Sequence, residues 1–258
     1  MTKIIGVTIL KDEDIWIGKA IENLLEFCDD FIILDNGSTD NTKEIIKKIG
    51  LDVIHESNLQ KTHDYILDYV GKNYWIHGFG GDEIFDPTGL IQVREKILNG
   101  YYKNTFQVYP YFLHAIKLND DYTQATGYLA PPSHPPGKLY NFNLIESWNN
   151  NYRNHIFLEK PRILKKNIIE EDKDFHKLSW DKCPYKCLHT RFFKRSTLEQ
   201  KESIGGKLNP ADLLGKNNKK DFGNKPNYNE RKKYKIGDLT TVDIKKFNLD
   251  KEYLNTVL

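Results

Sequence analysis

Acidic and polar side chains follow three short apolar stretches in the first third of this 258-residue chain. They are Thr8, Lys11 and Glu13 at the end of the first stretch, Asp35 after the second, and Asp82 with Glu83 after the third. Carboxylates that come together repel one another unless a cation or hydrogen-bond donors neutralise them. A hard divalent cation that takes oxygen ligands meets this need. The pattern therefore indicates a divalent-metal site.

Glycines lie immediately before Asp82, at Gly78, Gly80 and Gly81. Glycine lets a backbone approach a ligand closely, so a functional role is favoured for Asp82. Acids at strand ends can instead cap the next helix, and Asp40 is assigned to that role. The run GFGGDE lacks the third glycine of a dinucleotide fingerprint, and the chain has no phosphate-binding GxxxxGK[ST] loop. These absences argue against a kinase and against a Rossmann dehydrogenase.

Strand and helix patterns alternate through the first hundred residues. Apolar runs predict strands at 3–10, 31–34, 52–55 and 74–76, and helical spacing predicts helices at 14–28, 39–49, 65–70 and 86–100. Such alternation with short links predicts an α/β fold with a mainly parallel central sheet flanked by helices. In an open parallel sheet, ligands bind beyond the carboxyl ends of the strands, where the polar residues fall.

The rest of the chain is less regular. Strands are predicted at 105–109, 160–165 and 186–193, and a helix is predicted after Arg195. Residues 205–235 are rich in Asn, Lys, Gly and Pro and resemble a linker. We therefore expect an α/β half at 1–100, a second, less regular half of the same domain at 101–204, and a linker-like C-terminal extension at 205–258.

The overall charge and the cysteine content restrict the function classes. Lysine and arginine total 38 against 36 acidic residues, a net charge of +2, which argues against a nucleic-acid-binding protein. Three cysteines give no disulfide framework. No apolar run is long enough to cross a bilayer, and the N-terminus lacks a signal-peptide pattern, so a cytoplasmic protein is expected. A basic run near the C-terminus leaves peripheral membrane contact open.

Two segments resemble the family 2 glycosyltransferases. Residues 11–13 (KDE) and 20–40 (AIENLLEFCDDFIILDNGSTD) are similar to the opening of that family, and residues 75–85 (WIHGFGGDEIF) are similar to its aspartate-x-aspartate region. The resemblance is specific through about residue 90. It implies a GT-A fold, a nucleoside-diphosphate sugar as donor, and inversion at the anomeric carbon. On this resemblance, residues 1–100 would be the nucleotide-sugar-binding half and residues 101–204 the acceptor-side half of the same catalytic domain.

The resemblance also implies roles for individual residues. Thr8, Lys11, Glu13 and Asp35 would line the nucleotide, Gly81 would allow close backbone approach, and Lys61 or His63 would meet the diphosphate. Asp82 and His189 would bind Mn²⁺ or Mg²⁺, with imidazole better suited to manganese. Asp82 and Glu83 are the catalytic candidates, and Glu83, Glu146 and Asp181 are candidates for the general base that deprotonates the acceptor hydroxyl.

Several alternatives stay open from the sequence. Gly80 stands where the family has its first aspartate, which keeps a catalytically inactive sugar-nucleotide- or glycan-binding protein as an alternative. A nucleotidyltransferase is disfavoured because residues 11–14 (KDED) are too acidic for a triphosphate loop. A zinc site of Cys183, Cys187, His189 and His176 is disfavoured because the cysteine spacing has no second matching pair. The favoured function is a hexosyltransferase-like enzyme of glycan biosynthesis, which transfers a sugar to a hydroxyl of a glycan, polysaccharide or glycoconjugate.

Overall fold

The computed structural model describes residues 1–58, 61, 63–133, 136–148, 162–193, 196–197 and 234–249. The helix predicted after Arg195 lies outside these residues, as does the linker-like stretch apart from Tyr234 and Lys235.

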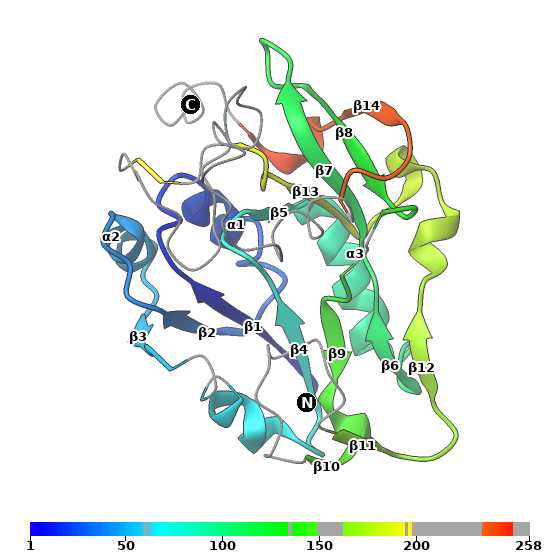
Figure 1. The fold of residues 1–258 in the computed structure, drawn as a ribbon. Helices are drawn as coiled ribbons and strands as arrows, with labels where there is room; N and C mark the ends of the chain where they lie inside the picture. Colours follow the sequence, from blue (N-terminus) through cyan, green and yellow to red (C-terminus); the bar gives the residue numbers. More distant parts are fainter. Residues whose placement is uncertain are drawn as a thin grey trace, which may run out of the picture.

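A seven-stranded sheet forms the centre of the molecule, in the order β12-β6-β9-β4-β1-β2-β3 (Figure 1). Its strands are β1 (Lys3–Leu10), β2 (Asp30–Asp35), β3 (Ile54–His55), β4 (Tyr74–Gly78), β6 (Thr105–Val108), β9 (Leu139–Asn141) and β12 (Ile169–Asp172). The neighbours β4, β1, β2 and β3 pair in parallel, as do β12 and β6, while β9 runs antiparallel to β4 and β6. The prediction of an α/β fold with a mainly parallel central sheet is confirmed.

Within the described ranges, three α-helices accompany this sheet, namely α1 (Ile17–Glu22), α2 (Thr42–Lys48) and α3 (Pro87–Leu98). The Asp86 side chain accepts a hydrogen bond from the Gly89 N–H at 3.1 Å, and Pro87 occupies the first turn, so α3 begins where the sequence predicts. The helix predicted at 14–28 is shorter, because from Asn23 onward the chain continues as turns. The segment predicted as a helix at 65–70 is the 3-10 helix η2 (Asp64–Tyr69).

A second sheet of five strands has the order β14-β8-β7-β13-β5 and lies above the central sheet in Figure 1. Its strands are β5 (Glu83–Phe85), β7 (Tyr111–Leu118), β8 (Gln124–Ala130), β13 (Lys186–His189) and β14 (Leu239–Asp243). The strand predicted at 186–193 ends at His189 because Thr190 turns away to donate its N–H to the Asp82 carbonyl at 2.8 Å. β14 pairs with β8, so residues 239–243 complete this sheet.

The remaining described elements are short. β10 (Ile145–Trp148) and β11 (Arg162–Leu164) form a two-stranded ribbon, and β11 lies within the strand predicted at 160–165. The other 3-10 helices are η3 (Phe142–Leu144), η4 (Asp174–Lys177), η5 (Trp180–Lys182) and η7 (Lys245–Phe247). No helix in the described ranges is long and apolar enough to cross a membrane.

Apolar clusters on both faces of the central sheet fix the edge at which the polar residues gather. Gly6 of β1 allows close packing there, because a Cβ at this position would lie 2.7 Å from the Phe31 ring and 3.2 Å from the Cys28 sulfur. Asn23 ties the end of α1 to the second sheet and to η7, since its side-chain amide donates to the carbonyls of Phe85 and Phe247 at 2.9 and 2.8 Å. Three hydrophobic clusters pack around the two sheets among the described residues.

His77 of β4 is fully buried among the rings of Phe27, Phe85 and Tyr185. Neither of its ring nitrogens bonds to another described residue. Burial, with a smaller contribution from the Lys138 charge, lowers the pKa of His77 to about 3. The imidazole is therefore neutral in the folded state at all but strongly acidic pH.

This buried histidine makes the protein sensitive to acid. Between pH 6.5 and about 3 the unfolded state binds a proton at His77 that the folded state does not. We therefore expect His77 alone to lower the free energy of unfolding by up to about 1.4 kcal/mol per pH unit as pH falls through this range. Urea unfolding at pH 7 and pH 5 measures this effect. On going from pH 7 to pH 5, the free energy of unfolding should fall more in wild type than in His77→Leu, which lacks the titrating group. A difference independent of pH would contradict this.

Candidate functional site

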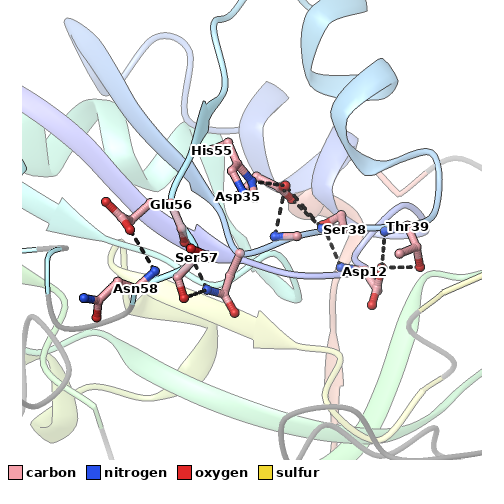
Figure 2. A network of polar contacts seen from close by, with 10 residues as sticks. Asp12, Asp35, Ser38, Thr39, His55, Glu56, Ser57 and Asn58 are labelled. Atoms are coloured by element: carbon pink, nitrogen blue, oxygen red, sulfur yellow. Dashed lines mark hydrogen bonds and ion pairs between the residues drawn. The ribbon is translucent and has the colours of Figure 1, made fainter.

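The loops that follow β1 and β2 are held together by side-chain to backbone hydrogen bonds (Figure 2). The Asp12 carboxylate accepts from the Thr39 N–H at 2.8 Å, and the Asp12 N–H donates to the Ser38 hydroxyl at 2.9 Å. Asp12 has a φ of 52°, in the left-handed region, so its conformation depends on these contacts. The two loops are therefore bound to each other at the carboxyl edge of the sheet.

Asp35 lies at the end of β2 in the same network and is fully buried. Its carboxylate accepts from the N–H groups of Gly37 and Ser38 at 3.1 to 3.2 Å. The exposed His55 side chain approaches it, with Nδ1 3.8 Å from Oδ2. Asn36 continues the network, since its amide donates to the carbonyls of Glu56 and Ser57 at 3.0 and 2.9 Å. Asp35 thus fixes the turn of the DNGST segment and brings polar groups of β2 and β3 together.

Glu13 and Gly81 bring the loops after β1 and β4 into contact. Glu13 is fully buried, and its N–H donates to the Thr42 hydroxyl at 2.8 Å. A Cβ at Gly81 would lie 2.7 Å from the Glu13 Cγ. The two loops therefore approach this closely only because residue 81 is glycine. The close approach predicted for this glycine is made to Glu13. Thr8 is also buried, and its hydroxyl makes no hydrogen bond with a described residue, while Lys11 is half-buried.

Asp82 and His189 lie side by side although 107 positions separate them in the sequence. Asp82 directly precedes β5 and His189 ends β13, and His189 pairs with Glu83 in the ladder between these strands. The His189 Nε2 lies 3.4 Å from the Asp82 Oδ2, and both side chains are buried. Thr190 holds the Asp82 carbonyl with its N–H and its hydroxyl, at 2.8 and 3.1 Å. The turn that carries Asp82 is therefore bound to the end of β13.

Glu83 makes a buried ion pair. Its Oε1 lies 2.7 Å from the Lys138 ammonium, and its Oε2 accepts from the Gly80 N–H at 2.7 Å. Both contacts stabilise the turn that presents Asp82. The other two candidates for a general base, Glu146 and Asp181, are exposed on β10 and η5.

Lys61 and His63 lie in the segment that leads to η2. Lys61 is exposed, and its positive charge helps to lower the pKa of Glu56, after the larger contributions of the Asn58 N–H and the Tyr65 hydroxyl. This places Lys61 on the β3 side of the site. His63 is buried.

His114 of β7 belongs to the same cluster and was not expected from the sequence. It is fully buried, and its Nδ1 lies 2.8 Å from the Nδ1 of His189 in the neighbouring parallel strand. The ring of Tyr234 packs edge-on against both histidines, at centroid distances of 4.9 and 6.0 Å. A histidine in a run of buried residues carries no local signal of this role.

The Asp82 and His189 side chains lie close enough to bind one divalent ion together. Among the described residues, no group of three or more His, Cys, Asp and Glu side chains is arranged to hold a metal. Asp82 and His189 nevertheless offer one oxygen and one nitrogen 3.4 Å apart. Neighbouring ligands of an octahedral ion lie about 3 Å apart when each is about 2.1 Å from the metal, so both atoms can reach one ion.

The two cysteines of the zinc alternative are buried as free thiols. Burial raises the pKa of the Cys183 thiol to about 12 and that of Cys187 well above its ordinary value. Cys183 donates to the Tyr185 carbonyl at 3.2 Å, and both sulfurs lie in the apolar core. His176 instead places its Nε2 3.0 Å from the Pro110 carbonyl. The structure therefore disfavours a zinc site at these residues.

Comparisons with known proteins give structural similarity only. No family model matches the chain, and no curated protein matches it. Glucosyl-3-phosphoglycerate synthase from Mycobacterium tuberculosis, solved with Mn²⁺ and UDP-glucose and also with Mg²⁺ and UDP, is 19% identical, with a TM-score of 0.35 over 43% of this chain and 44% of that chain. S. aureus TarS 1–349 is 15% identical, with a TM-score of 0.32 over 46% and 37%. The chain spans less than half the length of either protein. With TM-scores this low, the similarity does not assign a function.

Proposed function

We propose that this chain is a metal-dependent glycosyltransferase that takes its sugar from a nucleoside-diphosphate donor. The observation that carries the proposal is the Asp82–His189 pair, which lies 3.4 Å apart. It is linked to the loops of the KDE and DNGSTD segments through the close approach of Gly81 to Glu13. The residues that resemble two separate motifs of one family thus meet at one edge of the fold. A bound Mn²⁺ or Mg²⁺ would neutralise the charge that develops on the departing nucleoside diphosphate.

The chain's own residues would hold the donor. Asp35 and Thr8 lie at the carboxyl edge of the sheet, where a base and ribose would bind. The Glu13 side chain packs against the turn at Gly81. Lys11 and Lys61 would supply positive charge to the diphosphate, together with His63. Inversion follows if a carboxylate removes the acceptor proton on the face opposite the leaving group.

The proposed role of Glu83 is shaped by its contacts. Because Lys138 and the Gly80 N–H occupy its two oxygens, it can serve as a base only if the acceptor hydroxyl replaces one of these partners. Whether or not it acts as the base, Glu83 would position the turn before Asp82 through its contact with the Gly80 N–H. The acceptor is proposed to be a hydroxyl of a glycan or glycoconjugate.

A catalytically inactive sugar-nucleotide-binding protein is the second candidate. Residue 80 is glycine, so the site has no side chain at the position where the family carries its first aspartate. A Cβ added at Gly80 would lie only 2.8 Å from the Asp82 Oδ1. The metal would then rest on two protein ligands alone among the described residues. Such a site can bind a donor without turning it over.

A thermal-shift screen tests donor binding. Nucleoside diphosphates and nucleotide sugars are added with and without Mn²⁺, to wild type and to Asp82→Ala. A ligand at a hundredfold excess over its Kd stabilises the folded state by about 2.7 kcal/mol. We expect one nucleobase to raise the Tm in the presence of Mn²⁺, with the shift lost in Asp82→Ala. If no nucleotide raises the Tm under either metal condition, the proposed donor site is wrong.

A further inference from the structure

His114 lies behind His189, on the side away from Asp82. The two rings come from neighbouring parallel strands in direct register, and their Nδ1 atoms are 2.8 Å apart. The other nitrogen of His189, Nε2, is the one that faces Asp82 at 3.4 Å. Asp82, His189 and His114 therefore form a line in which the middle ring has polar groups at both ends.

Two nitrogens at 2.8 Å share one hydrogen. If His114 donates it, then a neutral His189 carries its own proton on Nε2 and presents an N–H to Asp82. If His189 donates it from Nδ1, then its Nε2 has a free lone pair on the side of Asp82. Only the second arrangement makes His189 a metal ligand, and it requires His114 to be the acceptor.

We propose that His114 is a positioning residue, which accepts the Nδ1 hydrogen of His189 and so directs the Nε2 lone pair of His189 to a metal ion shared with Asp82. This inference rests on the proposed function. Metal-bound histidines commonly donate their second N–H to a fixed acceptor, which sets their tautomer and their ring orientation. In this chain a neutral imidazole takes the place of the usual carboxylate or carbonyl acceptor.

The surroundings of His114 fix its ring for this task. The Phe112 ring stacks on it at an angle of 28° and a centroid distance of 5.8 Å, and Tyr234 closes the other side edge-on. The backbone is also fixed, because β8 passes so close that a Cβ at Gly127 would lie 2.3 Å from the His114 carbonyl oxygen. A ring packed in this way keeps its Nδ1 aimed at His189.

The test measures Mn²⁺ affinity directly, by the loss of the free-ion electron paramagnetic resonance signal on titration with protein. His114→Leu removes the acceptor, whereas His114→Asn retains an amide oxygen close to the position of Nδ1. His77→Leu is the matched control, since it removes another fully buried histidine that has aromatic neighbours but no contact with His189. Loss of an acceptor behind a metal-bound histidine weakens metal affinity about 10- to 100-fold.

We expect His114→Leu to weaken Mn²⁺ binding by about 10- to 100-fold, while His114→Asn and His77→Leu stay within about threefold of wild type. Nitrogen NMR of the protein loaded with diamagnetic Mg²⁺ in place of Mn²⁺ should show the proton of His189 on Nδ1. Wild-type affinity in His114→Leu, or equal losses in His114→Asn and His114→Leu, would overturn the inference and leave the proposed function standing. If wild type binds Mn²⁺ no better than His189→Ala, both the inference and the metal role of the site are wrong.

Discussion

Replacing Asp82 by asparagine should reduce sugar transfer by about a thousandfold. The change keeps the shape of the side chain but removes the negative charge of a carboxylate that lies 3.4 Å from His189 Nε2 and would hold the metal together with it. A metal that stabilises a departing diphosphate contributes several kcal/mol, and about 4 kcal/mol corresponds to a factor of about 10³ in rate. The measurement is the initial rate of nucleoside-diphosphate release from the donor that the thermal-shift screen identifies, at saturating Mn²⁺.

The matched control for that variant is Asp121→Asn. Asp121 is an exposed acid in the turn between β7 and β8, where it accepts a hydrogen bond from the Thr123 N–H at 3.1 Å. Its removal should leave the rate within about twofold of wild type, because surface changes away from the site have small effects. Equal rates in wild type and Asp82→Asn, at unchanged Tm, would contradict the assignment of Asp82.

Gly89→Ala should destabilise the protein by about 3 kcal/mol, which is the largest stability effect expected here. Alanine in a helix interior normally stabilises relative to glycine by about 1 kcal/mol. In α3, however, a Cβ at residue 89 would lie 1.9 Å from the Pro184 carbonyl oxygen, and a backbone atom cannot move aside as a side chain can. The helix and the segment before β13 would have to separate.

Urea unfolding measures this effect, with Gln92→Ala as the control on the exposed face of the same helix. The control should change the free energy of unfolding by no more than about 0.5 kcal/mol. A Gly89→Ala variant as stable as wild type would show that α3 does not pack against Pro184 as described. Gly89→Ala should also affect the site indirectly. A shift of Pro184 would be passed to β13, which follows it and carries His189.

The first hundred residues were predicted well because their signals are local. β1 and β2 are continuous apolar runs, and α3 begins with an Asp-Pro pair whose capping chemistry is visible in the sequence. The second sheet gives a weaker signal. In β7, four successive residues, 112–115, are all buried, so the strand lacks the alternation that marks a half-buried strand. β5 has three residues and directly follows a glycine turn.

The candidate site was predictable only in part, because several of its contacts join residues that are far apart in the sequence. Asp82 and His189 were identified by their resemblance to family motifs, and the structure brings them together. His114 was missed because its role depends on the pairing of β7 with β13, which joins residues 75 positions apart. The Glu83–Lys138 ion pair is likewise a product of the fold. The same holds for the contact of Gly81 with Glu13, where sequence reasoning anticipated a ligand.

The most direct test of the central claim is an anomalous-scattering map from crystals grown with Mn²⁺ and the nucleoside diphosphate that the thermal-shift screen selects. We expect one manganese peak about 2.2 Å from both the Asp82 carboxylate and the His189 Nε2, with diphosphate oxygens completing its coordination beside the DNGSTD loop. A nucleotide bound at this edge with manganese elsewhere, or with no manganese at all, would contradict the metal-bridged donor site.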